Sequence, residues 1–579
     1  MNAERLLQHY EMIADAPDAI ARLRRFILDL AVRGILVPQD PEDEPASELL
    51  KRIAREKARL VKAGEIRRER ELPSLSEVDS SFELPDYWTW VRLGDLTKFV
   101  TSGSRDWAKH YSNEGAIFVR MGNLSKDHYR LRLDQIQRVK APDDGEGTRT
   151  RLEADDILIS ITGDVGMLGL IPEGFGEAYI NQHTAMVRPV AEMKGRYLAE
   201  LFRSPFAQRQ FNEPQRGIKN SFRLTDITQF VVPLPPLAEQ YRIVAKVDEL
   251  MTLCDQLEAA RTEREVKRDW LAAASLARLK SPDPETFRDD ARFALEAFPT
   301  LTARPDQIKQ LRQTILNLAV RGKLVPQDPK DEPATELLER VRAEIVKQAK
   351  IRPSDTADTG STNDKQAVGG RIPSGWVKTK ISSVLISSFY GPRFNAEDYR
   401  NEGIPTVRTT DMTSDGRIDF RDPPRVTVPT DRLDDFRCKD GDLLVTRTGS
   451  IGTMALFLGD EVAIPSAYLI RLRFSSQVSP RYMHLTLRSP DGQAALGLGT
   501  TKVAQPNINA RALADIGLRL PPLAEQYRIV ARVDELMALC DQLEESLTTA
   551  DETRRKLLDA LLAEALAPVN AEDLQEAAE

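Results

Sequence analysis

The sequence predicts an α+β protein built as a pseudo-twofold tandem duplication, in which two mixed α/β domains are separated by long helices that form an antiparallel coiled coil. Residues 234–258 (LPPLAEQYRIVAKVDELMTLCDQLE) return as residues 520–544 with only two substitutions. Residues 23–50 return as residues 311–338 with few changes. Between these copies lie stretches that have diverged almost completely, so the constant parts share one task and the divergent parts perform two versions of another.

The duplication divides the 579 residues into six segments. They are an N-terminal helical region (1–83), a first mixed domain (84–232), a central helical region that repeats the N-terminal one (233–350), a polar linker (351–371), a second mixed domain (372–519) and a C-terminal helix (520–579).

The first constant segment predicts a helix, a loop and a second helix. Apolar residues recur at helical spacing from residue 20 to residue 31, and Gly34 ends that helix. The loop VPQDPEDEP follows, and Ser47 can cap a charged helix that runs to about Arg68. The same order of events follows Leu311.

The second constant segment predicts a long helix with a heptad seam. Its apolar residues step by four and three positions, and one helix cannot bury such a seam alone. We expect the two seams to pack against each other, with packing of each onto its own domain as the alternative. The seam residues are Ile243, Val247, Leu250, Cys254, Leu257, Ile529, Val533, Leu536, Cys540 and Leu543.

The mixed domains contain short β-branched runs bounded by Gly, Asp and Asn, which is typical of strands and turns. A common skeleton survives the divergence: Trp88 matches Trp376, Val119-Arg120 matches Val407-Arg408, and Thr162-Gly163 matches Thr448-Gly449. One fold therefore carries two different surfaces.

Composition is typical of a soluble protein, with 41% hydrophobic and 29% charged residues. No apolar run is long enough to span a bilayer, no signal peptide is present, and only three cysteines occur, so we expect a cytoplasmic protein without a zinc site. The net charge of −8 is uneven, with +1 in residues 84–232, +3 in residues 373–519 and −12 elsewhere. The relatively basic mixed domains favour a polyanion partner there, although chance variation in solvated faces explains the charge almost as well.

No catalytic motif is found along the chain. There is no phosphate-binding GxxxxGK[ST], no dinucleotide-binding GxGxxG after a strand, no HExxH and no GxSxG. Asp422-Pro423-Pro424-Arg425 lacks the aromatic residue with which an amino-methyltransferase stacks a flipped base. The chain is therefore predicted not to be an enzyme and to bind no metal.

The two repeated motifs, ILDLAVRGxLVPQDPxDEPAxELL and LPPLAEQxRIVxxVDELMxLCDQLE, closely resemble the conserved regions of type I restriction–modification specificity subunits. The resemblance covers essentially the whole chain in the order constant, variable, constant, variable, constant. Residues 181–189 (NQHTAMVRP) resemble a stretch of the family's target recognition domains, whereas Ile464-Pro465-Ser466-Ala467 stands at that place in the second domain.

The resemblance implies a non-catalytic subunit in which each mixed domain is a target recognition domain that reads one half of an asymmetric bipartite site in double-stranded DNA. It implies that the helices set the gap between the half-sites and dock two methyltransferase subunits and the restriction (motor and nuclease) subunits. S-adenosylmethionine, ATP and Mg²⁺ would belong to those partners, and this chain would bind no cofactor and no membrane.

Candidate DNA-binding residues are the polar and basic side chains on Gly-rich loops, because Arg can bind guanine and Asn adenine through two hydrogen bonds. Each of them can equally be a solvated loop residue. They are Ser102, Ser104, Arg105, Arg120, Asn123, Thr162, Lys219, Asn220, Ser221, Tyr390, Arg393, Arg408, Thr409, Asp411, Arg447, Thr448, Ser450 and Lys502.

Two other functions compete with this interpretation. A pseudo-symmetric coiled-coil scaffold that binds proteins without reading DNA would explain the duplicated helices. A fused methyltransferase–specificity enzyme is disfavoured, because the chain has no cofactor motif and no room for a catalytic domain.

Overall fold

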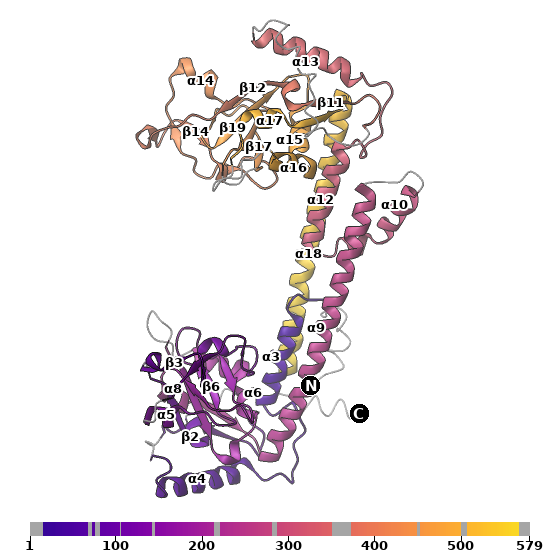
Figure 1. Ribbon diagram of the computed structural model, residues 1–579. Coiled ribbons are helices and arrows are strands. Elements are labelled where there is room, and N and C mark those ends of the chain that lie inside the picture. Colours follow the sequence, from indigo (N-terminus) through magenta and orange to yellow (C-terminus); the bar gives the residue numbers. More distant parts are fainter. Residues whose placement is uncertain are drawn as a thin grey trace. The chain divides into compact units, whose positions relative to one another are not determined.

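The computed structural model describes residues 15–67, 72–75, 82–104, 106–141, 145–212, 221–280, 286–349, 372–448, 452–498 and 507–566 (Figure 1). Contacts divide the chain into two compact units. Unit 1 holds residues 1–264 and 551–579, and unit 2 holds residues 265–550. Each unit combines helices with small sheets, which confirms the predicted α+β class. The six predicted segments stay a prediction.

The mixed domain of unit 1 contains a β1-β10 ribbon and two four-stranded sheets, ordered β2-β9-β6-β7 and β3-β5-β4-β8. All neighbours in these sheets are antiparallel except β4 and β8. The strands are β1 (Thr89–Arg92), β2 (Thr97–Ser102), β3 (Tyr111–Ser112), β4 (Ala116–Val119), β5 (Gln137–Val139), β6 (Ile157–Ser160), β7 (Leu168–Leu170), β8 (Ala178–Ile180), β9 (Thr184–Pro189) and β10 (Val231–Leu234).

The mixed domain of unit 2 repeats this topology strand for strand, with the β11-β20 ribbon and sheets ordered β12-β19-β16-β17 and β13-β15-β14-β18. Here the parallel neighbours are β14 and β18. The predicted tandem duplication is thereby confirmed. The strands are β11 (Val377–Lys380), β12 (Leu385–Tyr390), β13 (Tyr399–Arg400), β14 (Ile404–Val407), β15 (Arg425–Val426), β16 (Leu443–Thr446), β17 (Met454–Leu456), β18 (Ile464–Pro465), β19 (Leu469–Phe474) and β20 (Gly517–Leu520).

Short helices cover the sheets and complete the cores. All four residues of β6 (ILIS) and of β16 (LLVT) are buried, as expected for internal strands that are covered on both faces. The helices are α5 (Gly145–Thr150), α6 (Tyr197–Arg203), α7 (Pro205–Asn212) and α8 (Leu224–Thr228) in unit 1, and α14 (Thr430–Phe436), α15 (Pro480–Arg488), α16 (Pro490–Leu498) and α17 (Ala510–Ala514) in unit 2.

The duplicated helix–loop–helix segment forms α3 (Ala19–Val32) and α4 (Ala46–Lys62) in unit 1, and α12 (Pro305–Val320) and α13 (Ala334–Ala349) in unit 2. A left-handed glycine ends the first helix of each pair, with φ of 70° at Gly34 and 67° at Gly322. A Cβ atom on Gly34 would lie 2.5 Å from Pro85, and one on Gly322 would lie 2.4 Å from Pro373. Only glycine therefore lets each helix end against the first residues of its mixed domain.

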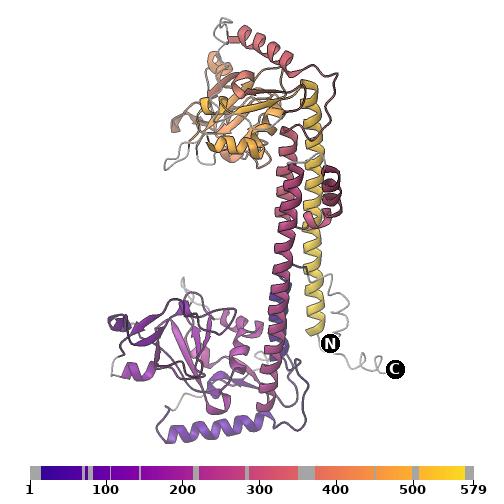
Figure 2. The ribbon, with the colours of Figure 1, turned by 45° about the vertical axis from the view of Figure 1, so that its right-hand side comes forward.

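The two predicted long helices are present as α9 (Leu237–Lys280) and α18 (Leu523–Leu566), each of 44 residues. Figure 2 shows α18 in yellow as one uninterrupted helix. Unit 2 also contains α10 (Phe287–Glu296) and α11 (Phe298–Leu301), whose apolar residues pack on the end of α9.

The seam of α9 is buried within unit 1 by α3. Ile243, Val247 and Cys254 share a core with Ile27 and Leu28 of α3. The two helices run antiparallel, because Arg24 near the start of α3 pairs with Glu258, whereas Gln39 beyond its end contacts Glu239. Leu250 is half-buried and Leu257 is exposed.

The seam of α18 is buried in the same way within unit 2 by α12. Ile529, Val533 and Cys540 share a core with Ile315 and Leu316, and Leu536 and Leu543 are half-buried against it. The heptad seam thus supports antiparallel helix packing, with the short helix of the same half as its partner. A short helix of the same half thus covers the first part of each seam.

Each unit also contains the final turns of the other half's long helix. In unit 1, Leu558 and Leu561 of α18 bury Ala16 and Ala19. In unit 2, Arg304 pairs with Glu265 and Asp269 of α9. Each short helix is therefore held by segments of both long helices.

A buried joint connects each mixed domain to the start of its long helix. Trp88 Nε1 donates to Glu239 Oε2 at 2.9 Å, and Gln39 Nε2 donates to Glu239 Oε1 at 2.7 Å. In unit 2, Trp376 and Gln327 hold Glu525 at 2.9 and 3.1 Å. Burial raises the pKa of both glutamates, and the hydrogen bonds from the Trp and Gln side chains oppose that rise. These donors therefore favour the ionised form of each carboxylate.

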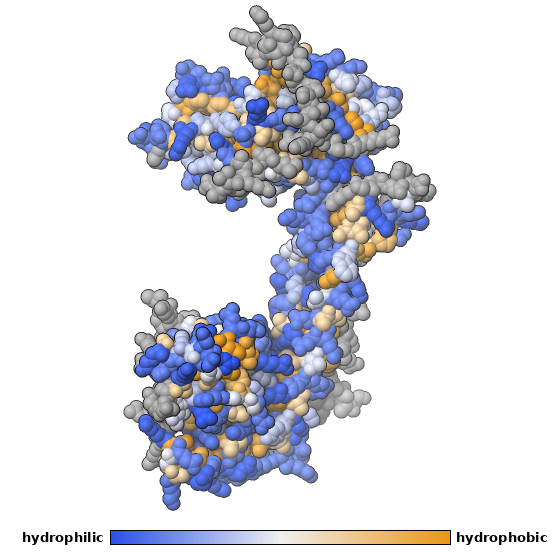
Figure 3. Space-filling model, in the orientation of Figure 1, coloured by the Kyte–Doolittle hydropathy of each residue, from blue (hydrophilic) through white to orange (hydrophobic). Residues whose placement is uncertain are grey.

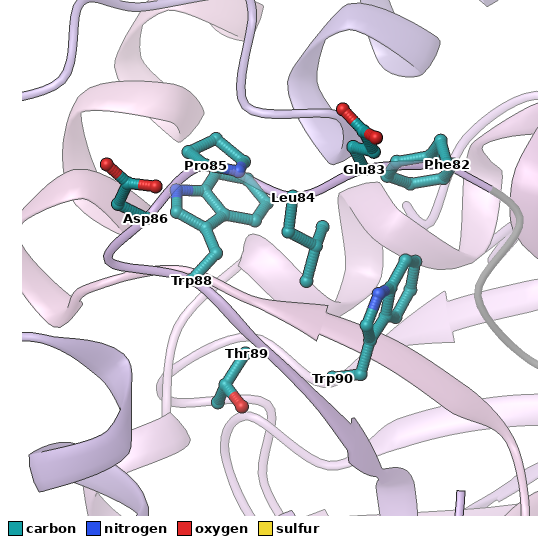
Figure 4. Close-up of a pocket in the computed structure, with 8 residues that line it drawn as sticks. All are labelled: Phe82, Glu83, Leu84, Pro85, Asp86, Trp88, Thr89 and Trp90. Atoms are coloured by element: carbon teal, nitrogen blue, oxygen red, sulfur yellow. The ribbon is translucent and has the colours of Figure 1, made fainter. Parts of the chain in front are cut away.

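An open hollow of about 600 Å³ lies beside the joint of unit 1 and is lined by residues 82–86 and 88–90. Figure 4 shows the Trp88 indole next to Pro85 and the Trp90 indole next to Phe82. The Phe82 and Trp90 ring centroids are 5.0 Å apart. These aromatic contacts fix the first residues of the mixed domain against its core.

Candidate nucleic-acid interface

Three chain segments meet at one edge of the β2-β9-β6-β7 sheet. Ser102, the last residue of β2, pairs with Ala185 of β9, and Ser160, the last residue of β6, pairs with Thr184, the first residue of β9. The turn formed by Gln182 and His183 leads into β9 at this same edge. The backbone N–H of Ile161, just beyond β6, donates to the carbonyl of His183 at 3.0 Å.

The polar side chains at this edge form the first strand-edge cluster, which we define as Ser102, Thr162, Gln182 and His183. Thr162 Oγ1 lies 2.7 Å from His183 Nδ1, and Gln182 Nε2 lies 2.8 Å from His183 Nε2. Both nitrogens of an exposed imidazole are thus held by neighbouring side chains. The cluster presents hydrogen-bonding groups in a fixed arrangement at the surface.

Unit 2 builds the equivalent edge from different side chains, and Tyr390, Arg447, Thr448 and Tyr468 form the second strand-edge cluster. Tyr390 ends β12 and pairs with Ile470 of β19. The backbone N–H of Arg447 donates to the backbone carbonyl of Tyr468 at 3.0 Å, which repeats the backbone contact between Ile161 and His183. The Arg447 guanidinium lies 4.9 Å from the centroid of the Tyr390 ring.

A glycine follows the first strand at both edges and permits a close backbone approach. A Cβ atom on Gly103 would lie 2.2 Å from the carbonyl oxygen of Ile180, and one on Gly391 would lie 2.0 Å from that of Ser466. Any larger residue would push the end of the strand away from the turn. The glycines therefore hold each strand-edge cluster together.

Two of the predicted DNA-binding residues, Asn123 and Asp411, are buried and hydrogen-bonded within turns of their own domains. Asn123 is buried, its Oδ1 accepts from the Arg120 N–H at 2.9 Å, and its amide nitrogen donates to the Arg132 carbonyl at 2.8 Å. Asp411 is buried at the matching position and accepts from the Arg408 N–H at 2.8 Å. The turn that follows β4 and β14 is thus fixed by the same device in both domains.

Arg408 is also held within the protein. Its Nη2 donates to Asp411 Oδ1 at 2.9 Å and to the Arg421 carbonyl at 2.8 Å. Arg120 and Thr409 are half-buried near these turns, and Arg393 is exposed after β12. Of these residues, Arg393 is the one whose exposure suits contact with a large partner.

Ser221 lies beside the first cluster, because it forms a β-bridge with Thr162. Asn507 forms the matching bridge with Thr448. Ser104 follows Gly103 and makes further interactions within the protein. The predictions for Arg105, Lys219, Asn220, Ser450 and Lys502 lie outside the described residues.

Several arginines of the mixed domains are occupied by buried ion pairs. Arg188 holds Asp156 at 2.7 Å, and Arg473 holds Asp442 at 2.6 Å. Burial raises the pKa of the Asp156 carboxyl, and the Arg188 guanidinium opposes that rise. These pairs connect β9 and β19 to the turns before β6 and β16, so their arginines support the fold.

The coloured part of each mixed domain that is visible in Figure 3 is largely polar. Figure 3 shows hydrophilic residues, in blue, over most of the visible face of each domain, with apolar residues in small patches. Within the described ranges, no group of His, Cys, Asp and Glu side chains is arranged to hold a metal ion. In that same part of the chain, no helix is both long and apolar enough to cross a membrane.

Gln182, His183 and Tyr468 are not among the DNA-binding residues expected from the sequence. The available signal was the difference between the two domains at the NQHT turn. Strand register matches Asn181–Thr184 with Ser466–Leu469 (SAYL), two residues later than the Ile464–Ala467 segment that the sequence comparison placed there. A turn that differs between two copies of one scaffold is a better candidate for recognition than a residue that both copies share.

Comparisons with known proteins agree with this architecture. A family model described as the type I restriction modification DNA specificity domain matches residues 85–268 and 373–550. The chain is 32% identical over 577 residues to the type I restriction enzyme EcoEI specificity subunit of Escherichia coli, with 94% of each chain covered. It is also 32% identical over 566 residues to the EcoAI specificity subunit of Escherichia coli, with 94% and 93% covered.

A solved structure concerned with the assembly and conformational transition of the type I R-M system supports the fold. It matches with a TM-score of 0.51 and 18% identity, over 84% of this chain and 98% of the other.

Proposed function

The chain belongs to the type I restriction–modification DNA specificity family, and we propose that it acts as the specificity subunit of such a complex. In this proposal each mixed domain is a target recognition domain that reads one half of an asymmetric bipartite site in double-stranded DNA. The observation that carries the proposal is the pair of strand-edge clusters. Two domains with one strand order present chemically different side chains at the same edge of the same sheet.

This arrangement suits bipartite recognition for a physical reason. Side chains read sequence by hydrogen bonds to base edges, while phosphate contacts set position without reading bases. A duplicated scaffold can keep its overall placement on DNA and change only the reading side chains. The two halves of the site therefore differ in sequence.

The long helices are proposed to set the gap between the half-sites and to dock two methyltransferase subunits, with restriction subunits joining the same complex. Exposed apolar residues support two equivalent docking faces. Tyr241 of α9 is 63% exposed and its repeat equivalent Tyr527 of α18 is 57% exposed. Leu253 and Leu539 are a second exposed pair at matching positions. Such paired exposure favours two copies of one partner.

The chain itself is proposed to be non-catalytic and to work in the cytoplasm. S-adenosylmethionine, ATP and Mg²⁺ would be bound by the partner subunits. A scaffold without DNA readout is the competing function, and it predicts a complex that forms fully but shows no preference among DNA duplexes.

The test is to express the chain with its methyltransferase subunits and to map the methylated bases of genomic DNA. We expect an asymmetric bipartite motif. Replacing residues 84–232 with the equivalent segment of a relative should change one half of the motif, and replacing residues 372–519 should change the other half. A continuous palindromic motif, or a change in both halves from one replacement, would contradict the proposal.

A further inference from the structure

The two strand-edge clusters occupy one position in the fold but carry different chemistry. The first cluster lies where β2 and β6 end and β9 begins. The second lies where β12 and β16 end and β19 begins. His183 and Tyr468 are the second residues of matching turns, and both side chains are exposed. The scaffold is constant here while the surface is not, as expected for a site that sets specificity.

The second cluster holds an arginine in a prepared conformation. The Arg447 guanidinium lies over the Tyr390 ring, and the Tyr390 hydroxyl accepts from the Ala510 N–H at 2.8 Å, which fixes the ring. The buried Nε of Arg447 has no hydrogen-bond partner among the described residues. A stacked guanidinium loses little freedom on binding, and its planar fork matches the O6 and N7 acceptors of guanine.

The first cluster offers a different donor and acceptor pattern. The His183 ring is held from both sides by Thr162 and Gln182, so its position is as well defined as that of Arg447. The first strand-edge cluster has no guanidinium, because Ile161 occupies the position that Arg447 has in unit 2. Both imidazole nitrogens are occupied by these contacts, so the amide oxygen and the second N–H of Gln182 are the groups that can read a base edge, and they do not provide the arginine fork.

Resting on the proposed function, we infer that the strand-edge clusters are the base-reading surfaces of the two domains. Arg447, supported by Tyr390 and flanked by Tyr468, reads a guanine in the half-site of the second domain. Gln182, held in place by His183, reads a base pair in the half-site of the first domain. Each cluster acts only on its own half-site.

The experiment uses the complex of the full chain with its methyltransferase subunits and a pool of duplexes randomised at each position of the mapped motif. Arg447→Lys keeps the charge and removes the fork, so preference for guanine at one position of one half-site should fall roughly ten- to hundredfold. Tyr468→Ala should weaken preference in that same half-site, and His183→Ala should do so only in the other one.

Two control substitutions change the same residue types outside the strand-edge clusters. Arg432 lies over the Phe436 ring at 4.9 Å, as Arg447 lies over Tyr390, but on α14, so Arg432→Lys should leave both half-sites unchanged. His128 is exposed outside the cluster, and His128→Ala should likewise have no effect on preference.

The unaffected half-site serves as a folding control within each variant. Unchanged preference in Arg447→Lys and His183→Ala complexes that still bind their motif would overturn the inference and leave the proposed function intact. Loss of preference in both half-sites from a single substitution would also overturn it. A wild-type complex with no sequence preference would instead refute the proposed function.

Discussion

The first prediction concerns the buried joint of unit 1 and the substitution Trp88→Phe. This substitution keeps an aromatic ring between the mixed domain and α9 but removes the N–H that donates to Glu239 at 2.9 Å. Glu239 is fully buried, so no water replaces the lost donor, and Gln39 alone then holds the carboxylate. A hydrogen bond to a charged group contributes about 1.5–3 kcal/mol, and we take about 2 kcal/mol as the loss.

A loss of about 2 kcal/mol raises the population of the opened joint about thirtyfold. Amide hydrogen exchange of residues 237–247 in α9 should accelerate by that factor, while residues 523–533 of α18 keep their protection. Trp376→Phe should have the mirror effect, because Trp376 holds Glu525 at the same distance.

The cost should also depend on pH. A protonated Glu239 needs its donors less than a carboxylate does, and burial already raises the pKa of this group. The effect of Trp88→Phe should therefore shrink as pH falls toward the pKa of Glu239. Trp270 is 71% exposed, so Trp270→Phe is the matched control and should leave exchange unchanged. Equal acceleration in both units, or none in α9, would refute the reasoning.

Two further predictions concern other features. Burial lowers the pKa of His484 to about 3, so between pH 6.5 and pH 3 the unfolded chain binds a proton that the folded chain does not. The free energy of unfolding should therefore fall as pH falls through this window, by about 2 kcal/mol from pH 7 to pH 5. Urea unfolding of His484→Gln should not show this decrease. The same pH dependence in the wild-type protein and the variant would count against the prediction. Inserting one heptad after both Leu257 and Leu543 should lengthen the DNA gap by about 10 Å, or roughly three base pairs, with unchanged half-sites. Methylation mapping checks this, and an unchanged gap with full activity would show that other elements set the distance.

The duplication, the strands and the long helices follow from the sequence because repetition and periodicity are local patterns. The partner of the heptad seam does not follow from them. A period of four and three identifies the buried face of α9 but not what covers it, and Ile27 and Leu28 of α3 lie more than 200 residues earlier in the chain. The cores place a short helix of the same half on the first part of each seam, a contact that the sequence pattern does not predict.

The candidate site shows the limit of reasoning from residue type. Asn123 and Asp411 were expected to contact DNA as polar residues on loops, yet both bury their polar atoms against their own turn. The matching spacing of Arg120 to Asn123 and of Arg408 to Asp411 was a signal of shared structure. His183 and Tyr468 become candidates once strand register brings their turn beside Thr162 and Arg447.

The division of the chain into units has a consequence for its synthesis. Ala16 and Ala19 are covered by Leu558 and Leu561, which a ribosome adds roughly 30–100 s later at typical rates of translation. Unit 2 draws on α9 residues that are already made, so its parts are all available once residue 550 has emerged. The half that is encoded first is therefore the half that closes last, and throughout translation the apolar start of α3 is exposed to chaperones and proteases.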